Sequence, residues 1–510
     1  MSRSKNTFRN LKYAVIGQGF GLMISLVSRI VFLHTLSDEY LGLNGIFANI
    51  LSVLSLAELG VGAAIIYSMY KPLAENDIYK IKALMSLYKK AYITVGIVIA
   101  FMGSALVPFL NVIIKDIPDI PYIKLIYLLF VINTSVSYFF SYKRSLLIAD
   151  QKRYIATLYR YGFYLLLNSA QIIMLLTTRN YIAFLLLQIA NTLLENIFVS
   201  LKADKLYPYL KDKNRAELNS EEKHTIIQNV KAMVFHKIGN TIVTGTDSIL
   251  ISMFVGVVEV GLYSNYLLII NALNTVYGLA FQSVTASIGN LGATESNIKN
   301  KFIFDCLNFL GFWIYGFSSI ALFVLFNPFI RIWLGEEYLF PLPVVFIIIV
   351  NFYLTGMRKS VLTYRDALGL FWYDRYKAVF EAVINLIASV ILVKYMGIGG
   401  ILVGTIISTL TTCFWVEPYV LFKYGLKQSF RPYLAKYVLY TIIMFMVGAF
   451  TWVISSAFSD YTIYGFAGKA LVCIIVPNIM FLTLFWKTDE FQYLLNTLQL
   501  INNGYIISKL

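Results

Sequence analysis

The sequence predicts an all-α polytopic membrane protein with 14 transmembrane helices, arranged as two pseudo-symmetric six-helix lobes plus two additional helices. Three observations predict this class. Of the 510 residues, 58% are hydrophobic and only 14% are charged, and the mean hydropathy of +0.70 is too high for a soluble fold of this size. Apolar segments long enough to cross a bilayer recur along the chain. Basic residues concentrate in alternate connecting loops.

The predicted helices are 14 apolar segments that follow one another along the chain. They cover residues 13–34, 41–69, 91–114, 121–148, 155–178, 181–201, 226–255, 260–289, 302–326, 341–362, 376–395, 398–422, 433–456 and 463–486. The first segment follows a basic stretch, as a signal peptide would. It is too long for the apolar region of a signal peptide and lacks a small-residue cleavage pattern, so we interpret it as a retained first helix.

The loops predict the orientation of these helices. With a cytoplasmic N-terminus, every cytoplasmic loop is rich in lysine and arginine, as around Lys80 and Lys82, Lys143 and Arg144, and Lys427. The intervening loops are short and nearly free of basic residues. By the positive-inside rule this alternation places both termini in the cytoplasm. The same distribution accounts for the net charge of +15, so we expect no nucleic-acid partner.

Motifs for catalysis or metal binding are missing from the sequence. Cys306, Cys413 and Cys473 lie in apolar runs without CxxC or Cys/His spacing, which predicts neither a disulfide nor a zinc site. No GxxxxGK(S/T), HExxH or GxSxG motif occurs, and no outside loop is long enough to hold catalytic carboxylates. We therefore expect a transporter without a cofactor, a metal or an ATP motor of its own, and not an enzyme.

A polar stretch between the sixth and seventh helices divides the chain. It predicts an N-terminal lobe at 1–201, a cytoplasmic linker at 202–225, a C-terminal lobe at 226–422, and helices 13 and 14 with a cytoplasmic tail at 423–510. The segments 39–43 (EYLGL) and 259–263 (EVGLY) open equivalent helices of the two lobes. Transporters built from parallel repeats of this kind bind their substrate at the interface between the lobes.

The segment from Tyr13 to His34 carries the first candidate site residues. Gln18, Ser25 and Arg29 are spaced i, i+7, i+11, which places them on one face of a helix. An arginine inside a spanning segment costs roughly 2.5–3.5 kcal/mol on insertion scales, so it normally faces a bundle interior or a water-filled cavity. We expect this face to contact substrate.

The predicted seventh helix, which is the counterpart of the first, carries a second polar stripe. His236, Asn240, Thr244 and Asp247 are spaced four, four and three residues apart on an otherwise apolar helix, with Lys237 beside them. The stripe predicts a cavity surface, although it would also suit a hydrogen-bonded seam between helices. The alternative for Lys237 is that its side chain extends to the membrane surface and places its charge in water.

The predicted second helix carries Asn44, Ser55 and Glu58 on one face. Glu58 is interpreted either as a titratable or cation-holding carboxylate that faces Arg29, or as its structural ion-pair partner. Four other acids in or near spans rank lower because none belongs to a polar stripe; they are Glu195, Asp305, Glu381 and Glu417.

Three segments carry a family resemblance: 38–45 (DEYLGLNG), 56–64 (LAELGVGAA) and 70–75 (YKPLAE). Together they resemble the Wzx-type polysaccharide flippases, which move O-antigen or capsule repeat units and belong to the multidrug/oligosaccharidyl-lipid/polysaccharide exporter (MOP) superfamily. The motif match is concentrated in the first three helices, whereas the match in helix number and lobes covers the whole chain.

The resemblance implies a protein of the bacterial inner (cytoplasmic) membrane that carries an undecaprenyl-diphosphate-linked oligosaccharide to the outer leaflet by alternating access. It implies a V-shaped pair of lobes around a cationic cavity, two extra helices that receive the lipid tail, and a contact of Arg29 with the diphosphate or an acidic sugar. Polysaccharide polymerase and glycosyltransferases of the same pathway would be partners, besides membrane lipids. The polymer remains open between O-antigen, which is part of lipopolysaccharide, capsule and another surface glycan.

Our own polar-stripe interpretation supplies the remaining site residues. The candidate substrate-binding residues are Arg29, Gln18, Ser25, Asn44, His236, Lys237, Asn240 and Thr244. The candidates for coupling to H⁺ or Na⁺ in antiport are Glu58, Asp247 and His236.

Three alternatives stay open. A cation-coupled multidrug antiporter of the same superfamily usually has 12 helices, and its cationic drugs would prefer a cavity without Arg29. A peptidoglycan-precursor flippase has 14 helices but resembles this chain less in the second helix. A non-transporting scaffold of a polysaccharide assembly complex would tolerate the loss of Arg29.

Overall fold

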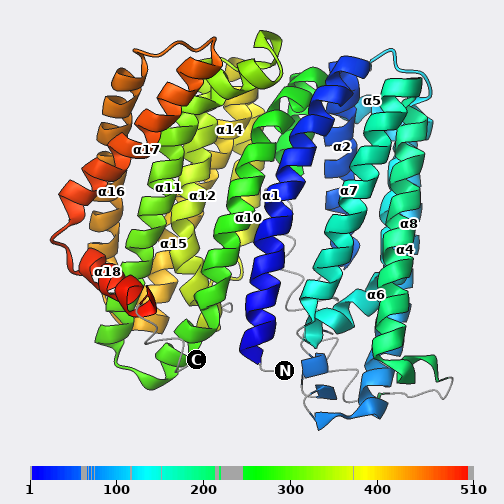
Figure 1. Ribbon diagram of the computed structural model, residues 1–510, viewed down its shortest axis with the longest axis horizontal. Helices are drawn as coiled ribbons and strands as arrows, with labels where there is room; N and C mark the ends of the chain where they lie inside the picture. The colour runs from blue at the N-terminus through cyan, green and yellow to red at the C-terminus, as the bar shows by residue number, and fades with distance from the viewer. Residues whose placement is uncertain are drawn as a thin grey trace. The chain divides into compact units, whose positions relative to one another are not determined.

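The computed structural model describes residues 3–58, 66, 68–70, 72–73, 75–114, 118–150, 152–212, 218–219, 245–370 and 373–502. Across these residues the chain is helical and contains no strand, which confirms the all-α prediction (Figure 1). Eleven described helices are long and apolar enough to cross a membrane, or 12 spans if the bent pair Ile123–Phe139 and Ser141–Ala149 is counted as one. The chain is therefore a multi-pass membrane protein.

Two of the 14 predicted spans have no full counterpart among these 12. The predicted span 41–69 begins as α2 (Asp38–Leu54) and the 3₁₀ turn η1 (Ser55–Glu58), and the predicted span 226–255 ends as a helix over 245–254. The rest of each segment lies largely outside the described residues. The number 14 therefore stays a prediction.

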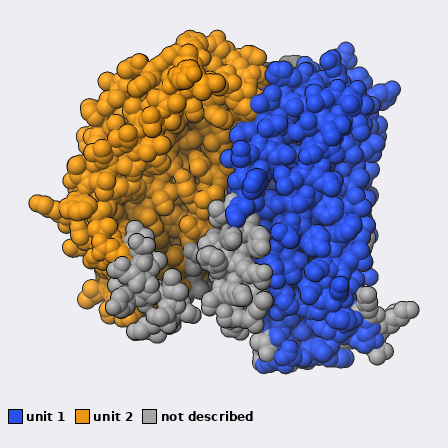
Figure 2. Space-filling model, in the orientation of Figure 1, with its two compact units in different colours: residues 1–264 blue, residues 265–510 orange. Residues whose placement is uncertain are grey.

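The chain forms two compact units, Met1–Ser264 and Asn265–Leu510 (Figure 2). Their boundary falls inside α10, and the predicted lobe limits at 201 and 226 remain predictions. In unit 1, α1 packs on α7, and α6 packs on both α4 and α8. The helices of unit 1 not yet given are α1 (Arg3–Thr35), α4 (Ile78–Ala105), α5 (Leu110–Ile113), α6 (Ile123–Ala149), α7 (Arg153–Thr178) and α8 (Tyr181–Leu206).

Unit 2 is built around α11, which packs on α12, α16 and α17. The predicted span 398–422 is a helix whose α-helical parts, α14 and α15, are each followed by a π-helical turn, at Thr409–Cys413 and Leu421–Leu426. The boundary between the units lies within α10 (Val257–Thr294), and the rest of α10 belongs to unit 2. The helices that follow it are α11 (Asn297–Trp333), α12 (Leu342–Ala367), α13 (Lys377–Met396), α14 (Ile398–Ser408), α15 (Phe414–Val420), α16 (Arg431–Ser455), α17 (Ile463–Phe485) and α18 (Asp489–Asn502).

The third predicted helix begins earlier than expected. The prediction starts at residue 91, after a run of lysines, whereas α4 starts at Ile78 and includes Lys80 and Lys82. The carboxylate of Asp77 accepts a hydrogen bond from the backbone N–H of Lys80 (2.9 Å) and so caps the helix. Lysine is a good helix former, so the lysines do not end the helix. The low hydropathy of this stretch marks where α4 leaves the membrane, whereas α4 itself begins earlier, at Ile78.

The C-terminal helix α18 is held against unit 2 by charges. Lys436 of α16 forms ion pairs with Glu490 of α18 and with Asp305 of α11, at 3.2 Å in the second case. Burial opposes ionisation of Glu490, but the hydrogen bond and charge of Lys436, a backbone hydrogen bond and the charge of Lys301 together outweigh it and lower the pKa of this carboxyl. This part of the predicted cytoplasmic tail is therefore an ordered helix.

The three cysteines are buried, as their apolar surroundings predict. Cys306 lies on α11, Cys413 in the π-helical turn after α14, and Cys473 on α17, and all three are free thiols. No group of three or more His, Cys, Asp or Glu side chains suited to a metal ion occurs in the described part of the chain.

Within unit 1, the two segments that resemble one another in sequence pack together through their glycines. A Cβ atom on Gly42 of α2 would lie 2.0 Å from the carbonyl oxygen of Val257 at the start of α10. A Cβ atom on Gly261 would lie 3.2 Å from the backbone nitrogen of Gly42. The missing side chains allow the two backbones to approach closely, as small residues do between membrane helices.

We predict that Gly42→Ala destabilises unit 1 by about 1–3 kcal/mol, because the new methyl group meets a backbone atom that no side-chain rotation can clear. The melting temperature of the purified protein in detergent, followed by far-UV circular dichroism, measures the effect, since all six tryptophans of the chain lie in unit 2. Gly19→Ala on α1 is the matched control, since its Cβ would meet nothing within 4 Å. Equal melting temperatures for the two variants would contradict the prediction.

Candidate functional site

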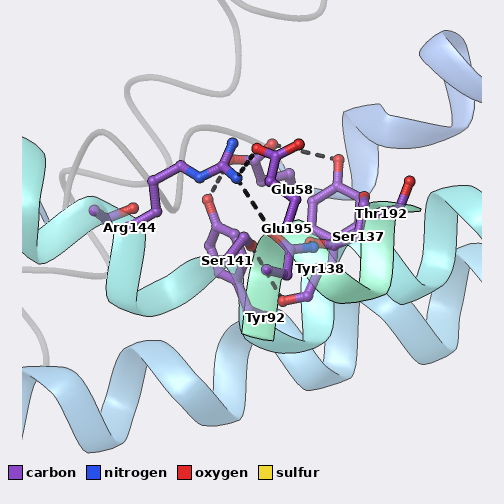
Figure 3. Close-up of a pocket in the computed structure, with 10 residues that line it drawn as sticks. Glu58, Tyr92, Ser137, Tyr138, Ser141, Arg144, Thr192 and Glu195 are labelled. Atoms are coloured by element: carbon purple, nitrogen blue, oxygen red, sulfur yellow. Dashed lines mark hydrogen bonds and ion pairs between the residues drawn. The ribbon is translucent and has the colours of Figure 1, made fainter. Parts of the chain in front are cut away.

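A polar pocket of about 370 Å³ lies inside unit 1 (Figure 3). The 3₁₀ turn η1 contributes Glu58, and the other lining side chains come from α4, α6 and α8. Its lining contains hydroxyls, an amide, two carboxylates and a guanidinium. The lining residues are Glu58, Tyr92, Ser137, Tyr138, Ser141, Arg144, Ser145, Thr192, Glu195 and Asn196.

A bend in α6 brings its share of these residues to the pocket. The segments Ile123–Phe139 and Ser141–Ala149 meet at 46°. The hydroxyl of Ser137 donates to the carbonyl of Thr134 (2.7 Å), and that of Ser141 donates to the carbonyl of Tyr138 (3.1 Å). Serine hydroxyls that bond back to the preceding turn commonly accompany helix bending. The pocket therefore depends on this local distortion.

Glu58 accepts hydrogen bonds from two tyrosines in this pocket. The hydroxyl of Tyr92 donates to its Oε1 (2.6 Å), and the hydroxyl of Tyr138 lies 3.5 Å from its Oε2. Tyr88 extends this series of hydrogen bonds, because its hydroxyl donates to that of Tyr92 (3.1 Å) and lies 2.9 Å from the hydroxyl of Ser145. Glu58 is thus held in place by hydroxyl groups of α4 and α6.

Arg144 supplies the positive charge of the pocket. Its Nη2 forms an ion pair with Glu195 and donates to the side-chain oxygen of Asn196 (3.3 Å). Its Nε is buried and makes no hydrogen bond within the described part of the chain. In Figure 3 the Arg144 guanidinium and the carboxylates of Glu58 and Glu195 point towards one another. With every group ionised, the pocket carries one net negative charge.

Arg29 lies in a separate place in unit 1. Its Nη1 donates to the hydroxyl of Ser264 on α10 (3.0 Å). No carboxylate of the described residues lies within ion-pair distance of Arg29, so a neutral hydroxyl is the partner of a half-buried guanidinium. The predicted pairing of Arg29 with Glu58 is not formed, because Glu58 lies in the pocket with Tyr92 and Tyr138.

Gln18 and Ser25 contact α7. The hydroxyl of Tyr161 donates to the side-chain oxygen of Gln18 (3.1 Å), and the hydroxyls of Ser25 and Tyr164 share a short hydrogen bond. Gly17 lies under the ring of Tyr161, where a Cβ atom would be 2.2 Å from that ring. These two polar residues therefore belong to a hydrogen-bonded contact between α1 and α7.

The other predicted site residues divide into two groups. Asn44 and Asp247 are half-buried in unit 1, and Asp247 is close enough to Tyr263 to interact with it electrostatically. Ser55 donates to the carbonyl of Leu51 (2.7 Å) in its own helix. The remaining four lie outside the described residues, namely His236, Lys237, Asn240 and Thr244.

The pocket contains residues that the sequence interpretation ranked low or assigned elsewhere. Glu195 was ranked low because it belongs to no polar stripe in the sequence, and Arg144 was counted with a cytoplasmic loop. A signal for both was present: Thr192, Glu195 and Asn196 are spaced i, i+3, i+4 on α8, and α6 carries polar residues spaced i, i+4, i+7 and i+8 from Ser137.

A second set of buried charges lies in unit 2. Arg358 of α12 forms two hydrogen bonds with Glu417 of α15, at 3.0 and 2.7 Å, and lies 3.5 Å from Glu381 of α13. Lys377 of α13 also pairs with Glu417, whose side chain is 0% exposed. Each charge in this cluster has an opposite partner, which indicates a structural role for Glu381 and Glu417.

Comparisons with known proteins identify the class of fold. No protein-family model matches the sequence, and no curated protein matches it in a sequence search. Solved structures do match, and they show that this chain has the fold of the lipid II flippase MurJ and of a MATE family transporter of the MOP superfamily.

Three of these structures are similar over most of the chain. The lipid II flippase MurJ covers 92% of this chain and 98% of its own, with a TM-score of 0.64 and 13% identity. A multidrug resistance MATE family transporter in an inward-facing conformation covers 81% and 99%, with a TM-score of 0.61 and 13% identity. The MATE transporter VcmN of Vibrio cholerae covers 83% and 98%, with a TM-score of 0.58 and 12% identity. At these identities the likeness shows the fold alone.

Proposed function

We propose that this protein is a flippase that moves an undecaprenyl-diphosphate-linked oligosaccharide from the inner to the outer leaflet of the bacterial cytoplasmic membrane by alternating access. The repeat unit would serve surface polysaccharide biosynthesis. The observation that carries the proposal is Arg29, a spanning-helix cation whose partner in the described structure is the hydroxyl of Ser264 and not a carboxylate.

The chemistry of Arg29 favours an anionic cargo. A guanidinium in a membrane span is costly, and a neutral hydroxyl leaves its charge uncompensated. Its planar fork of donors suits phosphate oxygens and stays charged at every physiological pH. A diphosphate cannot cross hydrocarbon unaided, and Arg29 would supply the charge that it lacks there. Gln18, Ser25 and Asn44 would contribute polar contacts nearby, together with His236, Lys237, Asn240 and Thr244.

The coverage of the structural matches favours a lipid-linked cargo over a drug. MurJ is a lipid II flippase by name, and it matches 92% of this chain, compared with 81% and 83% for the two MATE transporters. A drug-exporting antiporter would also be expected to avoid a cavity arginine, since its substrates are cationic. A peptidoglycan-precursor flippase remains the second candidate. The structure that covers 92% of this chain is named as a lipid II flippase, and the cargo of such a flippase is also a lipid-linked diphosphate.

The polar pocket of unit 1 supports H⁺ as the coupling ion, with Glu58 as the carrier. A sodium ion prefers a shell of oxygen ligands without a neighbouring cation, whereas Arg144 projects into this pocket. A carboxylate among hydroxyl donors exchanges a proton without such a shell. Transfer of negative cargo outward gains roughly 2.3 kcal/mol per charge per 100 mV, and the proton would reset the empty carrier. Asp247 and His236 remain further candidates.

Reconstitution tests the proposed function. Proteoliposomes that contain the purified protein and a fluorescent undecaprenyl-diphosphate oligosaccharide should move the lipid between leaflets, measured as the fraction of label accessible to an added quencher or glycosidase. Vesicles without protein are the control. Export of a cationic dye with no movement of the lipid would support the multidrug antiporter. Movement of neither would support the scaffold.

We predict that Glu58→Gln makes lipid movement insensitive to an imposed pH gradient, because an amide cannot exchange a proton. In a pH gradient, the initial rate of lipid movement by this variant should fall to the rate that the wild-type protein shows without a gradient. The measurement compares initial rates with a pH gradient, a sodium gradient or neither. Glu337→Gln, at an exposed carboxylate of unit 2, is the control and should respond like the wild type. A wild-type rate that follows only the sodium gradient would contradict proton coupling.

A further inference from the structure

A shallow basic pocket of about 530 Å³ lies at one end of unit 2, apart from the sites already described. It occupies the connection between the π-helical turn Leu421–Leu426 and the first turn of α16. Its lining contains two lysines, two aromatic residues and two neutral polar side chains. The lining residues are Tyr419, Lys423, Lys427, Gln428, Ser429 and Phe430.

Local backbone features shape this pocket. Pro418 inside α15 lacks a backbone N–H, and the π-helical turn after it widens the helix and reorients the residues that follow. Lys427 ends the turn with a left-handed φ of 53°, and the N–H of Gln428 donates to the carbonyl of Phe422 (2.9 Å). The connection is therefore a tight, hydrogen-bonded turn that holds both lysines close to α16.

The positive charge of the pocket has no acidic counterpart. Lys423, Lys427 and the adjacent Arg431 are exposed, and none lies within ion-pair distance of a carboxylate in the described structure. The nearby acids are occupied, since Glu417 pairs with Arg358 and Lys377, and Asp374 pairs with Arg365 (2.6 Å). The N-terminal turn of α16 adds partial positive charge beside Arg431.

Aromatic contacts fix the orientation of one lysine. The Nζ of Lys423 donates to the hydroxyl of Tyr419 (2.8 Å). The same Nζ lies 5.1 Å from the ring centre of Tyr419 and 5.2 Å from that of Tyr424, within the range of cation–π attraction. Lys423 is therefore held in place without being neutralised.

The same aromatic residues indicate the depth of the pocket in the membrane. Tyr424 stacks on Tyr373 with ring centres 3.9 Å apart, and both rings remain exposed, at 38% and 51%. Exposed tyrosine and tryptophan side chains gather where headgroups meet the hydrocarbon. The two candidate spans Ile398–Leu426 and Arg431–Ser455 both end at this connection, so the pocket lies at the level of the lipid headgroups.

We propose that this pocket binds the phosphate headgroup of an anionic phospholipid from the surrounding leaflet. Lys423 and Lys427 contact the phosphate, Gln428 and Ser429 donate to its oxygens or to the polar part of the headgroup, and Phe430 contacts the start of the acyl chains. Basic pockets between spanning helices at the membrane surface bind headgroups in this way. The positive-inside rule places this end in the cytoplasmic leaflet.

Native mass spectrometry of the full-length protein tests the proposal. The protein is released from vesicles of phosphatidylcholine that contain a fixed small fraction of phosphatidylglycerol, and bound phosphatidylglycerol is counted. Lys423→Gln/Lys427→Gln should lower its affinity about tenfold, whereas Lys423→Arg/Lys427→Arg should retain it. Lys487→Gln removes an exposed lysine at the end of α17 and should bind like the wild type.

Two further measurements make the result decisive. The melting temperature of each variant shows whether it folds, and if the double glutamine variant does not, Lys423→Gln alone replaces it. Excess inorganic phosphate should leave lipid binding largely unchanged, since it lacks the apolar contacts. Equal phosphatidylglycerol binding by the wild type and the glutamine variant would overturn the proposal. So would full displacement of the lipid by inorganic phosphate, which would assign the pocket to a soluble anion.

Discussion

Replacement of Arg29 with alanine should reduce lipid movement at least tenfold and cause the lipid-linked oligosaccharide to accumulate on the cytoplasmic side. Under the proposed function, the variant loses the hydrogen bonds of Arg29 to a charged phosphate group, each of which contributes about 1.5–3 kcal/mol. It also loses the hydrogen bond to the hydroxyl of Ser264. The proteoliposome assay measures the rate, and labelling of intact cells measures surface polysaccharide.

Two variants separate charge from geometry in this experiment. Arg29→Lys keeps the positive charge but loses the planar fork, so an intermediate rate is expected. Arg160→Ala removes an exposed arginine from α7 in the same unit and should transport like the wild type. Full surface polysaccharide in the alanine variant would favour the scaffold alternative and refute a role of Arg29 in transport.

Replacement of Glu417 with glutamine should destabilise unit 2 by about 3–5 kcal/mol, because it leaves Arg358 and Lys377 without their shared partner inside the bundle. The carboxylate is completely buried, so water cannot take its place. Thermal unfolding of the purified protein in detergent, followed by tryptophan fluorescence, measures the loss. The variant should also be depleted from membranes in cells, since a destabilised membrane protein is degraded.

A double replacement tests the cause of this effect. Arg358→Met together with Glu417→Met removes both charges of the bidentate pair and should recover part of the lost stability, since no half of that pair remains, although Glu381 loses Arg358 and Lys377 loses Glu417. Glu337→Gln, which neutralises an exposed carboxylate, should leave the melting temperature unchanged. If the double variant were less stable than Glu417→Gln, the unpaired charge would not explain the loss.

The sequence predicts the helices well because hydropathy over about 20 residues is a local property. Twelve of the predicted spans have a counterpart in the described structure. The predicted start of the third helix, α4, was wrong because Lys80 and Lys82 lower the hydropathy without ending the helix. Membrane depth and helix length are separate properties, and a hydropathy pattern reports only the first.

The candidate site was harder to predict because its residues come from four separate elements. The cost of a charge in the membrane singles out Arg29 from sequence alone. The partners of Glu58 depend on a bend in α6 and on the packing of α4, α6 and α8, which no single helix encodes. For Gln18 and Ser25, a shared helix face was correctly identified, but the same face also suits the contact with Tyr161 and Tyr164 that the structure contains.

Burial of all three native thiols has a practical consequence. Cys306, Cys413 and Cys473 are shielded by packed helices, so water-soluble maleimides should react with them slowly. A cysteine introduced at an exposed position in each unit would then carry a fluorophore or spin label without prior removal of the native ones. Distances between such labels, recorded before and after addition of the lipid-linked oligosaccharide, would report the rearrangement that the proposed transport cycle requires.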